Sequence, residues 1–339
     1  VSAWGLVLGC AGERFVDQRL DVVISVEPDD AGVAPKPALL STKRSPAQPS
    51  TSPQAETEMV RGAGLRTCQT GAMQLTKHHG LGNDFLIALA DALPADAPAM
   101  AEAACHRTRG VGADGLIFGL PGDAGAGTDV TMVLFNADGS RAEMSGNGIR
   151  CLAQAFVQHD DRGTNRELSI GTDAGIRTVS VESTADPTVV QARVDMGPIG
   201  PGPNLEDGEV AHYLRNHGFA DHFFTADVGN PHLMVGVNDV QLIDVARNGS
   251  ELSRLAGGIN VEFISATSVG IDMRVWERGV GVTEACGTGA CAAAQAAHHW
   301  GLVGPVVSVS MPGGDVVVKL GDTAVLTGPS QYIATVDYG

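Results

Sequence analysis

Two short segments, one in each half of the chain, place a small nucleophilic residue in front of a Gly-x-Gly turn. Ser145 precedes Gly146-Asn147-Gly148, and Cys286 precedes Gly287-Thr288-Gly289. Glycines let the backbone approach a ligand closely, and the first N–H groups of a following helix attract an anion. Two such turns that face each other would hold a carboxylate and place Ser145 and Cys286 on opposite sides of the carbon that bears it.

This arrangement suits the inversion of a stereocentre next to a carboxylate. Such a reaction needs a base on one face of the carbon and an acid on the other. The helix N-termini would stabilise the charge that develops on the carboxylate, and they would lower the pKa of the Cys286 thiol. A purely structural cysteine and a phosphate site are the alternatives, although the chain has no Gly-x-x-x-x-Gly-Lys motif.

The two segments belong to an internal repeat, which indicates duplication of a half-domain. An ungapped alignment of Ser145 with Cys286 keeps six identities, which pair Glu143 with Glu284, Gly146 with Gly287, Gly148 with Gly289, and Ala153-Gln154-Ala155 with Ala294-Gln295-Ala296.

The elements that must position these turns are short strands and a few Ala-rich helices. Helical composition predicts helices over 90–106, 146–158 and 287–300. Apolar and alternating runs predict strands over 130–135, 167–170, 176–182, 306–311 and 316–320, with hairpin turns at 171–175 and 312–315. The pattern is therefore an early helix followed by two β-rich halves, each with a central helix.

Residues 1–72 differ from the rest of the chain. The stretch 31–58 is rich in Pro, Ser, Thr and Ala and has neither the helical nor the strand period. We expect residues 1–72 to be a disordered extension that precedes the first patterned segment at Met73.

Composition excludes several classes of partner. A formal charge of −17 argues against nucleic acid or anionic membrane as the main partner, since both require basic patches. No apolar run approaches the roughly 20 residues of a membrane span. The six cysteines show no disulfide framework, so we expect reduced thiols in a cytoplasmic protein. Cys286 and Cys291 lie on one helix and point in different directions, so no metal site is expected.

Several motifs, taken in order, resemble those of the diaminopimelate epimerase family. They are Lys77-His78-His79-Gly80-Leu81-Gly82-Asn83-Asp84-Phe85, Asn136-Ala137-Asp138-Gly139-Ser140 through Gly148, Gly229-Asn230-Pro231-His232, Gly258-Ile259-Asn260-Val261, and Glu277-Arg278-Gly279 through Gly289. The resemblance covers residues 73–339.

The resemblance implies an isomerase that needs no pyridoxal phosphate or other cofactor. It would convert LL- to meso-2,6-diaminopimelate by two-base proton transfer, in lysine and peptidoglycan precursor biosynthesis. The implied fold is α/β (α+β) with two pseudo-symmetric domains, each a β-barrel-like sheet wrapped around a central helix, in a homodimer. Residues 73–190 with the last strand 330–339 would form the first half, and residues 191–329 the second.

The resemblance also assigns roles to individual residues. Cys286 would be one catalytic acid or base, with Ser145 at the position of the other, and Glu277 and His232 would assist. Substrate-binding positions would be Asn83, Asn136, Gly146, Asn147, Asn230, Asn260, Glu277, Arg278, Gly287 and Thr288.

Ser145 departs from the family pattern, which has Cys at this position. A neutral hydroxyl is a far poorer base than a thiolate unless another group takes its proton, so turnover is expected to be impaired. Three explanations stay open. Ser145 is a natural variant that relays a proton through Glu143, a water or His232; or it is an engineered trapping mutation; or the enzyme performs one-base chemistry such as proton exchange or elimination.

Rival functions also stay open. A related racemase, epimerase or dehydratase would act on another amino acid such as proline or hydroxyproline. A non-catalytic paralogue would only bind an amino acid.

Overall fold

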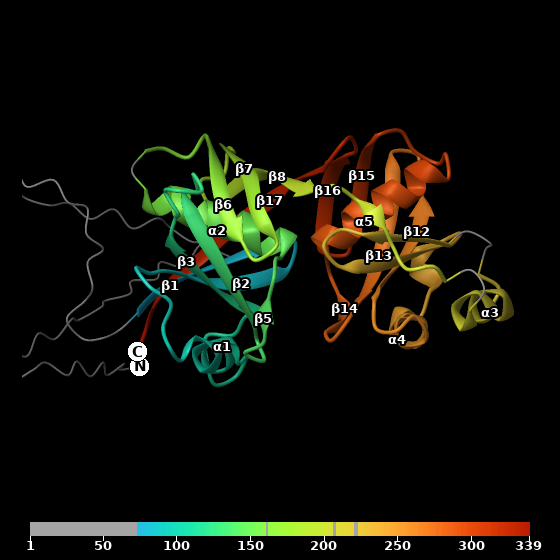
Figure 1. Ribbon diagram of the computed structural model, residues 1–339, viewed down its shortest axis with the longest axis horizontal. Coiled ribbons are helices and arrows are strands. Elements are labelled where there is room, and N and C mark those ends of the chain that lie inside the picture. The colour runs from blue at the N-terminus through green and yellow to red at the C-terminus, as the bar shows by residue number, and fades with distance from the viewer. Residues whose placement is uncertain (1–72, 161, 206–207, 220–222) are drawn as a thin grey trace, which may run out of the picture. The chain divides into compact units, whose positions relative to one another are not determined.

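Seven strands from the first half of the chain and the last strand, β17 (Ala324–Tyr338), close into a barrel, which Figure 1 shows around α2 (Gly146–His159). The computed structural model describes residues 73–160, 162–205, 208–219 and 223–339, so the extension expected over residues 1–72 lies outside the described residues. Each strand is hydrogen-bonded to the next and the last returns to the first. In this order they are β1 (Met73–Gly80), β2 (Asn83–Leu89), β3 (Gly115–Pro121), β4 (Val130–Asn136), β6 (Arg166–Thr172), β7 (Gly175–Ser183), β8 (Val189–Gly197) and β17 (Ala324–Tyr338).

The second half repeats this order of parallel and antiparallel pairs. The parallel pairs β2–β3 and β4–β6 correspond to β11–β12 and β13–β15. Each half also has a two- or three-residue strand that returns against its fourth strand, β5 (Arg141–Ala142) and β14 (Gly281–Thr283). The strands of the second sheet are β9 (Gly200–Pro201), β10 (Phe223–Asp227), β11 (Pro231–Gly236), β12 (Asn260–Ala266), β13 (Gly270–Glu277), β15 (Val306–Met311), β16 (Gly314–Lys319) and the first part of β17.

One central helix fills each half. Helix α2 (Gly146–His159) contacts seven of the eight strands of the first barrel, and α5 (Gly287–His299) contacts β10–β13 and β15–β17 of the second sheet. The inward residues of strands alternate with outward ones, as in β8, where Val190, Ala192 and Val194 are buried. Alanines on α5 keep this helix thin enough to be enclosed by strands, and residues 290–294 are all fully buried. These features confirm the fold expected from the sequence.

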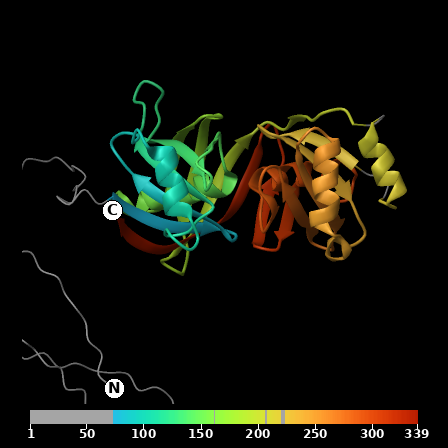
Figure 2. The same ribbon diagram turned by 90° about the horizontal axis from the view of Figure 1, so that it is seen from below.

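The remaining helices cover the outer faces of the sheets (Figure 2). Helix α1 (Ala97–Cys105) packs on β3 and β4, while α3 (Glu209–Asn216), the short helix η1 (Val240–Leu242) and α4 (Val245–Leu255) cover the second half. None of the described helices is long and apolar enough to cross a membrane.

Two expected elements differ from the structure. The first helix begins at Ala97 rather than at residue 90. Pro98 lies in its first turn, where proline is tolerated, whereas Pro94 would lie inside a helix that began at residue 90 and would break it. Strand β16 begins at Gly314, so the hairpin turn is shorter than the expected segment 312–315. The hairpin across 171–175, with Thr172 opposite Gly175, and the helices 146–158 and 287–300 are confirmed within one or two residues.

Two strands pass between the halves. β17 pairs with β16 at residues 325–327 and then with β8 and β1 as far as Tyr338. Strand β8 runs to Gly197, past the boundary expected at residue 190, and leads into β9, which pairs with β10. We therefore propose that the first half ends at Gly197. These crossings bring the N-terminal ends of α2 and α5 together.

Candidate active site

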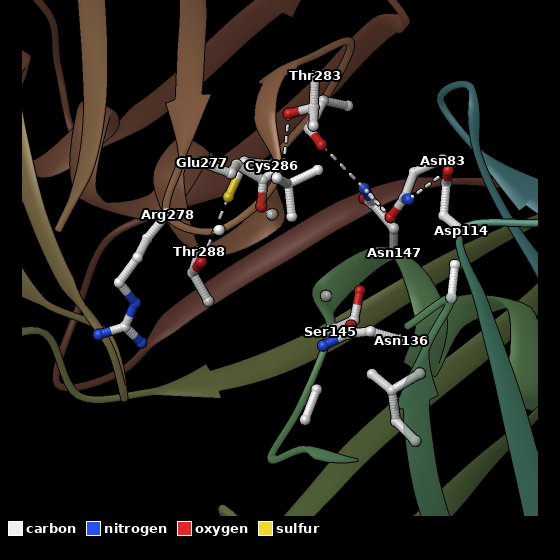
Figure 3. A pocket seen from close by; sticks show the side chains of 18 of the residues that line it. Asn83, Asp114, Asn136, Ser145, Asn147, Glu277, Arg278, Thr283, Cys286 and Thr288 are labelled. Atoms are coloured by element: carbon white, nitrogen blue, oxygen red, sulfur yellow. Dashed lines mark hydrogen bonds between the residues drawn. The ribbon is translucent and has the colours of Figure 1, made fainter. Parts of the chain in front are cut away.

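A cavity of about 880 Å³ lies between the starts of α2 and α5 (Figure 3). Residues from both halves line it, and it contains every expected site residue except His232. Those that line it are Asn83, Asn136, Ser145, Gly146, Asn147, Asn230, Asn260, Glu277, Arg278, Cys286, Gly287 and Thr288. Ser145 and Cys286 therefore line one cavity.

Ser145 and Cys286 have the same local structure. Both are N-cap residues in extended conformation, with φ and ψ of −134° and 124° for Ser145 and of −131° and 119° for Cys286. Each side chain accepts a hydrogen bond from the N–H group three residues later, at 3.0 Å for Ser145 Oγ and 3.4 Å for Cys286 Sγ. The other N–H groups of the first turn have no acceptor inside their helix, so both helix starts offer donors to an anion.

The two helix starts approach each other at a pair of glycines. A Cβ atom added to Gly146 would lie 3.2 Å from the Cα atom of Gly287, and one added to Gly287 would lie 3.1 Å from the Cα atom of Gly146. Only glycine allows this backbone-to-backbone approach without displacing either helix. The two turns therefore lie side by side, and residues of both line the cavity.

The surroundings of Cys286 favour the neutral thiol over the thiolate. Burial raises the pKa of the thiol well above its usual value, and the negative charges of Glu277 and Glu262 raise it further. Hydrogen bonds from Thr288 and from the N–H group of Gly289 oppose these effects but are weaker. The helix start does lower the pKa of Cys286 through the Gly289 N–H group, but burial and the two carboxylates outweigh this effect, so the net shift is upward.

Glu277 is an ionisable residue that lines the cavity together with Cys286. Burial raises the pKa of this carboxyl, and the charge of Glu262 raises it too, whereas hydrogen bonds from Thr283 and Cys286 lower it. Thr283 Oγ1 donates to Glu277 Oε1 (Figure 3).

The residues behind the two helix starts differ in charge. A Cβ atom on Gly148 of α2 would meet Ile117 Cδ1 at 3.0 Å, whereas one on Gly289 of α5 would meet Glu262 Oε1 at 2.5 Å. Ile117 and Glu262 occupy equivalent places on the parallel pairs β2–β3 and β11–β12. A buried carboxylate thus supports the turn of Cys286, and an isoleucine supports the turn of Ser145.

The same contrast holds at two further positions. Phe85 pairs with the first residue of β3, as His232 pairs with the first residue of β12. Asn136 ends β4, as Glu277 ends β13. Three ionisable residues therefore gather on the Cys286 side, and their counterparts on the Ser145 side do not ionise at physiological pH.

His232 lies behind the cavity and does not line it. It is fully buried, with Nδ1 2.7 Å from Glu262 Oε1 and Nε2 2.9 Å from Asn230 Oδ1. Both ring nitrogens are occupied, so His232 positions Asn230 and Glu262. It makes no hydrogen bond with Ser145, so it does not relay a proton for that residue in this structure.

Ser145 also lacks a proton acceptor elsewhere in the described chain. Its Oγ accepts from Gly148, and no hydrogen bond joins it to a carboxylate or imidazole among the residues described. Glu143 is exposed and has no hydrogen bond to Ser145 in the part of the chain that the structure describes. Glu143, His232 and a water were the proton relays expected for Ser145, and of these the water is the one compatible with the described structure.

An ion-pair network holds Asn83 at the other end of the cavity. Asn83 Nδ2 donates to Asp114 Oδ2 at 2.7 Å, and its Oδ1 accepts from Asn147 Nδ2 at 3.2 Å (Figure 3). Arg107 Nη2 forms ion pairs with Asp114 Oδ1 at 2.6 Å and with Asp84 Oδ1 at 2.7 Å. The orientation of the Asn83 amide is therefore fixed by its neighbours.

Arg278 is the cation that faces the cavity from the second half. Its backbone N–H donates to Asn260 Oδ1 at 2.9 Å, and Nη1 donates to the Gly258 carbonyl at 3.4 Å. Within the described residues its guanidinium has no ion-pair partner. It is free to bind a carboxylate of a ligand.

Comparison with known proteins shows which family the chain resembles. The family model described as diaminopimelate epimerase matches residues 75–200 and 224–333. A diaminopimelate epimerase from Desulfitobacterium hafniense is 40% identical over 277 residues, which cover 77% of this chain and 96% of that protein. Diaminopimelate epimerase 1 from Nostoc sp. is 38% identical over 282 residues, which cover 78% of this chain and 99% of that protein.

The chain belongs to the diaminopimelate epimerase family. Solved structures of lower identity share the fold of this diaminopimelate epimerase family member. A predicted epimerase from Pseudomonas aeruginosa superposes with a TM-score of 0.62 at 17% identity, covering 78% of this chain and 98% of that chain. A probable proline racemase from Agrobacterium radiobacter superposes with a TM-score of 0.60 at 14% identity, covering 79% and 93%.

Several residues in or next to the candidate site are not predicted by the sequence motifs. Glu262 follows Asn260 by two residues on β12, so strand alternation alone placed both on one face and could have indicated it. Asp114 and Arg107 reach Asn83 from a distant loop, and no local pattern reports that contact. Glu284, which lines the cavity, was recognised only as the repeat partner of Glu143.

Proposed function

We propose that this protein is a cofactor-independent epimerase that converts LL- to meso-2,6-diaminopimelate, a step that supplies lysine and peptidoglycan precursors. Family membership and the names of its relatives support this function. The observation that carries the mechanism is that Ser145 and Cys286 cap two helices that open onto one cavity.

The cavity can hold an amino acid at both ends. The reacting carboxylate binds between the helix starts at Gly146-Asn147 and Gly287-Thr288, where N–H donors and two helix dipoles favour negative charge. Arg278 binds the distal carboxylate, and the amides of Asn83, Asn230 and Asn260 bind the remaining amino and carboxylate groups. A substrate with two amino-acid ends therefore satisfies more of the polar lining than a single-ended one.

Proton transfer proceeds from opposite faces of the α-carbon. On one face the α-proton leaves to the oxygen of Ser145, which passes its own proton to a water in the cavity. The electron pair left on the α-carbon delocalises into the carboxylate, whose charge the helix starts stabilise. On the other face Cys286 donates its thiol proton to the α-carbon, and the resulting thiolate is reprotonated through Glu277.

The two faces are unequal in this mechanism. The Cys286 side contains Glu277 as an acceptor and donor of protons, whereas the Ser145 side depends on water. We therefore propose that loss and gain of a proton at the Ser145 face limits turnover.

Conversion of LL-diaminopimelate followed by chiral chromatography tests the function. We expect the meso isomer to accumulate to equilibrium without added cofactor, and we expect proline and trans-4-hydroxyproline to remain unchanged. Inversion of proline or hydroxyproline in place of diaminopimelate would assign the protein to another substrate.

One-sided chemistry is the second candidate, and the missing acceptor beside Ser145 favours it. Such an enzyme would exchange the α-proton of one isomer with solvent deuterium and leave its configuration intact. A non-catalytic binder would do neither. Deuterium at the α-carbon, measured together with configuration, separates the three functions.

We also propose that the protein is a homodimer in the cytoplasm. The acidic composition and the absence of a disulfide framework suit a reducing compartment, and the family resemblance implies two subunits. Light scattering after size-exclusion chromatography tests the dimer, which should have twice the 34.9 kDa mass of the chain.

A further inference from the structure

Arg150 is a fully buried cation directly behind the start of α2. Its guanidinium donates to the Gly146 carbonyl at 2.9 Å, to Asn147 Oδ1 at 2.9 Å and to the Pro329 carbonyl at 3.2 Å. All three acceptors are neutral, and Arg150 has no ion-pair partner among the described residues. Burial lowers the pKa of Arg150 to about 10, so it remains charged at neutral pH.

Two of these acceptors belong to the turn that opens onto the cavity. The Gly146 carbonyl shares its peptide unit with the N–H group of Asn147, so a guanidinium bound to that carbonyl makes the N–H a stronger donor. The bond to Asn147 Oδ1 turns Asn147 Nδ2 toward Asn83 Oδ1 at 3.2 Å and the Ala285 carbonyl at 3.3 Å. Arg150 thus connects the first helix start with the residue before Cys286.

The charge behind the other helix start has the opposite sign. In the repeat, Arg150 aligns with Cys291, which is neutral, while Glu262 lies against Gly289. A buried cation that contacts only neutral acceptors is unfavourable, because carbonyl dipoles replace only part of its hydration. A carboxylate bound in front of α2 would supply the missing negative charge.

We propose that Arg150 is a positioning residue that provides the buried positive charge holding the reacting carboxylate of the substrate at the start of α2. This inference rests on the proposed function, since the carboxylate belongs to diaminopimelate. Arg150 does not line the cavity, so it acts through the Gly146-Asn147 turn and through its charge.

Calorimetric binding of diaminopimelate to Arg150→Gln and Arg150→Lys tests this role. Both variants keep a hydrogen-bond donor, and only the lysine keeps the charge. We expect Arg150→Gln to weaken binding and raise KM at least about tenfold, and Arg150→Lys to stay within about threefold of the wild type. The matched controls Arg166→Gln and Arg166→Lys change a part-buried arginine that pairs with Asp160 outside the cavity, and binding should not change.

The pH dependence of Arg150→Lys gives a second measurement, which stands even when Arg150→Gln does not fold. A buried amine loses its proton at lower pH than a guanidinium. Affinity of this variant should therefore fall relative to the wild type as the pH rises from 7 to 9. Parallel pH profiles, or wild-type affinity in folded Arg150→Gln, would overturn the proposal. If the wild type itself neither binds nor epimerises diaminopimelate, the proposed function fails first.

Discussion

Asn136 is the last residue of β4, and Glu277 is the last residue of the corresponding strand β13 in the second half. Both side chains line the same cavity. The amide cannot accept a proton at physiological pH, whereas the pKa of Glu277 is raised by its burial. An internal duplication has therefore kept the shape of two facing sites while their acid–base chemistry diverged.

Replacement of Ser145 by cysteine tests whether this face limits turnover. A thiol loses its proton far more readily than a hydroxyl, so Ser145→Cys should raise kcat for LL-diaminopimelate by roughly tenfold or more. Ser169→Cys, on β6 outside the cavity, is the control and should change nothing. An unchanged kcat in Ser145→Cys would show that another step is rate-limiting.

Removal of the charge on Glu277 should speed the alkylation of Cys286 and slow epimerisation. The carboxylate raises the pKa of Cys286, so Glu277→Gln lowers that pKa and increases the thiolate fraction at a given pH. Iodoacetamide should then label Cys286 several-fold faster, as followed by peptide mass spectrometry. Epimerisation should fall by about a hundredfold or more, since the acceptor of the Cys286 proton is lost.

Glu251, which pairs with Arg254 and does not line the cavity, provides the control for this pair of measurements. Glu251→Gln should leave labelling and turnover as they are in the wild type. Slower labelling of Cys286 in Glu277→Gln would contradict the electrostatic effect assigned to Glu277.

The close approach of the two helix starts can be tested at Gly146. A Cβ atom there would lie 3.2 Å from both Gly287 Cα and Met196 Cε, so Gly146→Ala must separate the two turns. We expect KM for diaminopimelate to rise and the protein to lose about 1–3 kcal/mol of stability. Gly304→Ala is the matched control, because a Cβ atom there meets nothing within 4 Å. Equal kinetics in both variants would show that the contact of the helix starts is not required.

His78 should make the fold sensitive to acid. Burial lowers the pKa of His78 from 6.5 to about 4, so the folded state favours the neutral imidazole. Its contribution is present above pH 6.5 and is lost as the pH falls from 6.5 toward 4, by at most about 3 kcal/mol. Urea unfolding across this range should show a smaller pH dependence in His78→Gln than in the wild type, while exposed His159→Gln should retain the full dependence.

Local patterns in the sequence predict the elements of the fold and the two helix starts, whereas the other residues expected to line the site come from the resemblance to the diaminopimelate epimerase family. Hairpin turns, strand alternation and the two Gly-x-Gly helix starts are encoded within a dozen residues. The repeat then related one half to the other, so that Ser145 and Cys286 were expected to face each other.

Long-range contacts account for what the sequence did not reveal. The raised pKa of Cys286 depends on burial and on the charges of Glu277 and Glu262, which come close to it only in the folded protein. The position of His232 behind the cavity likewise follows from its pairing with Glu262 across β11 and β12. A sequence motif identifies each residue, but it does not show which charges surround that residue in the folded protein.

Incubation of LL-diaminopimelate in deuterium oxide with the wild type, Ser145→Ala and Cys286→Ala tests the central claim most directly. Configuration and deuterium content at the α-carbon are measured together over time. The two-faced mechanism predicts that the wild type forms meso-diaminopimelate with deuterium at the inverted carbon, and that both variants lose inversion. Wild-type inversion rates in Ser145→Ala would contradict it.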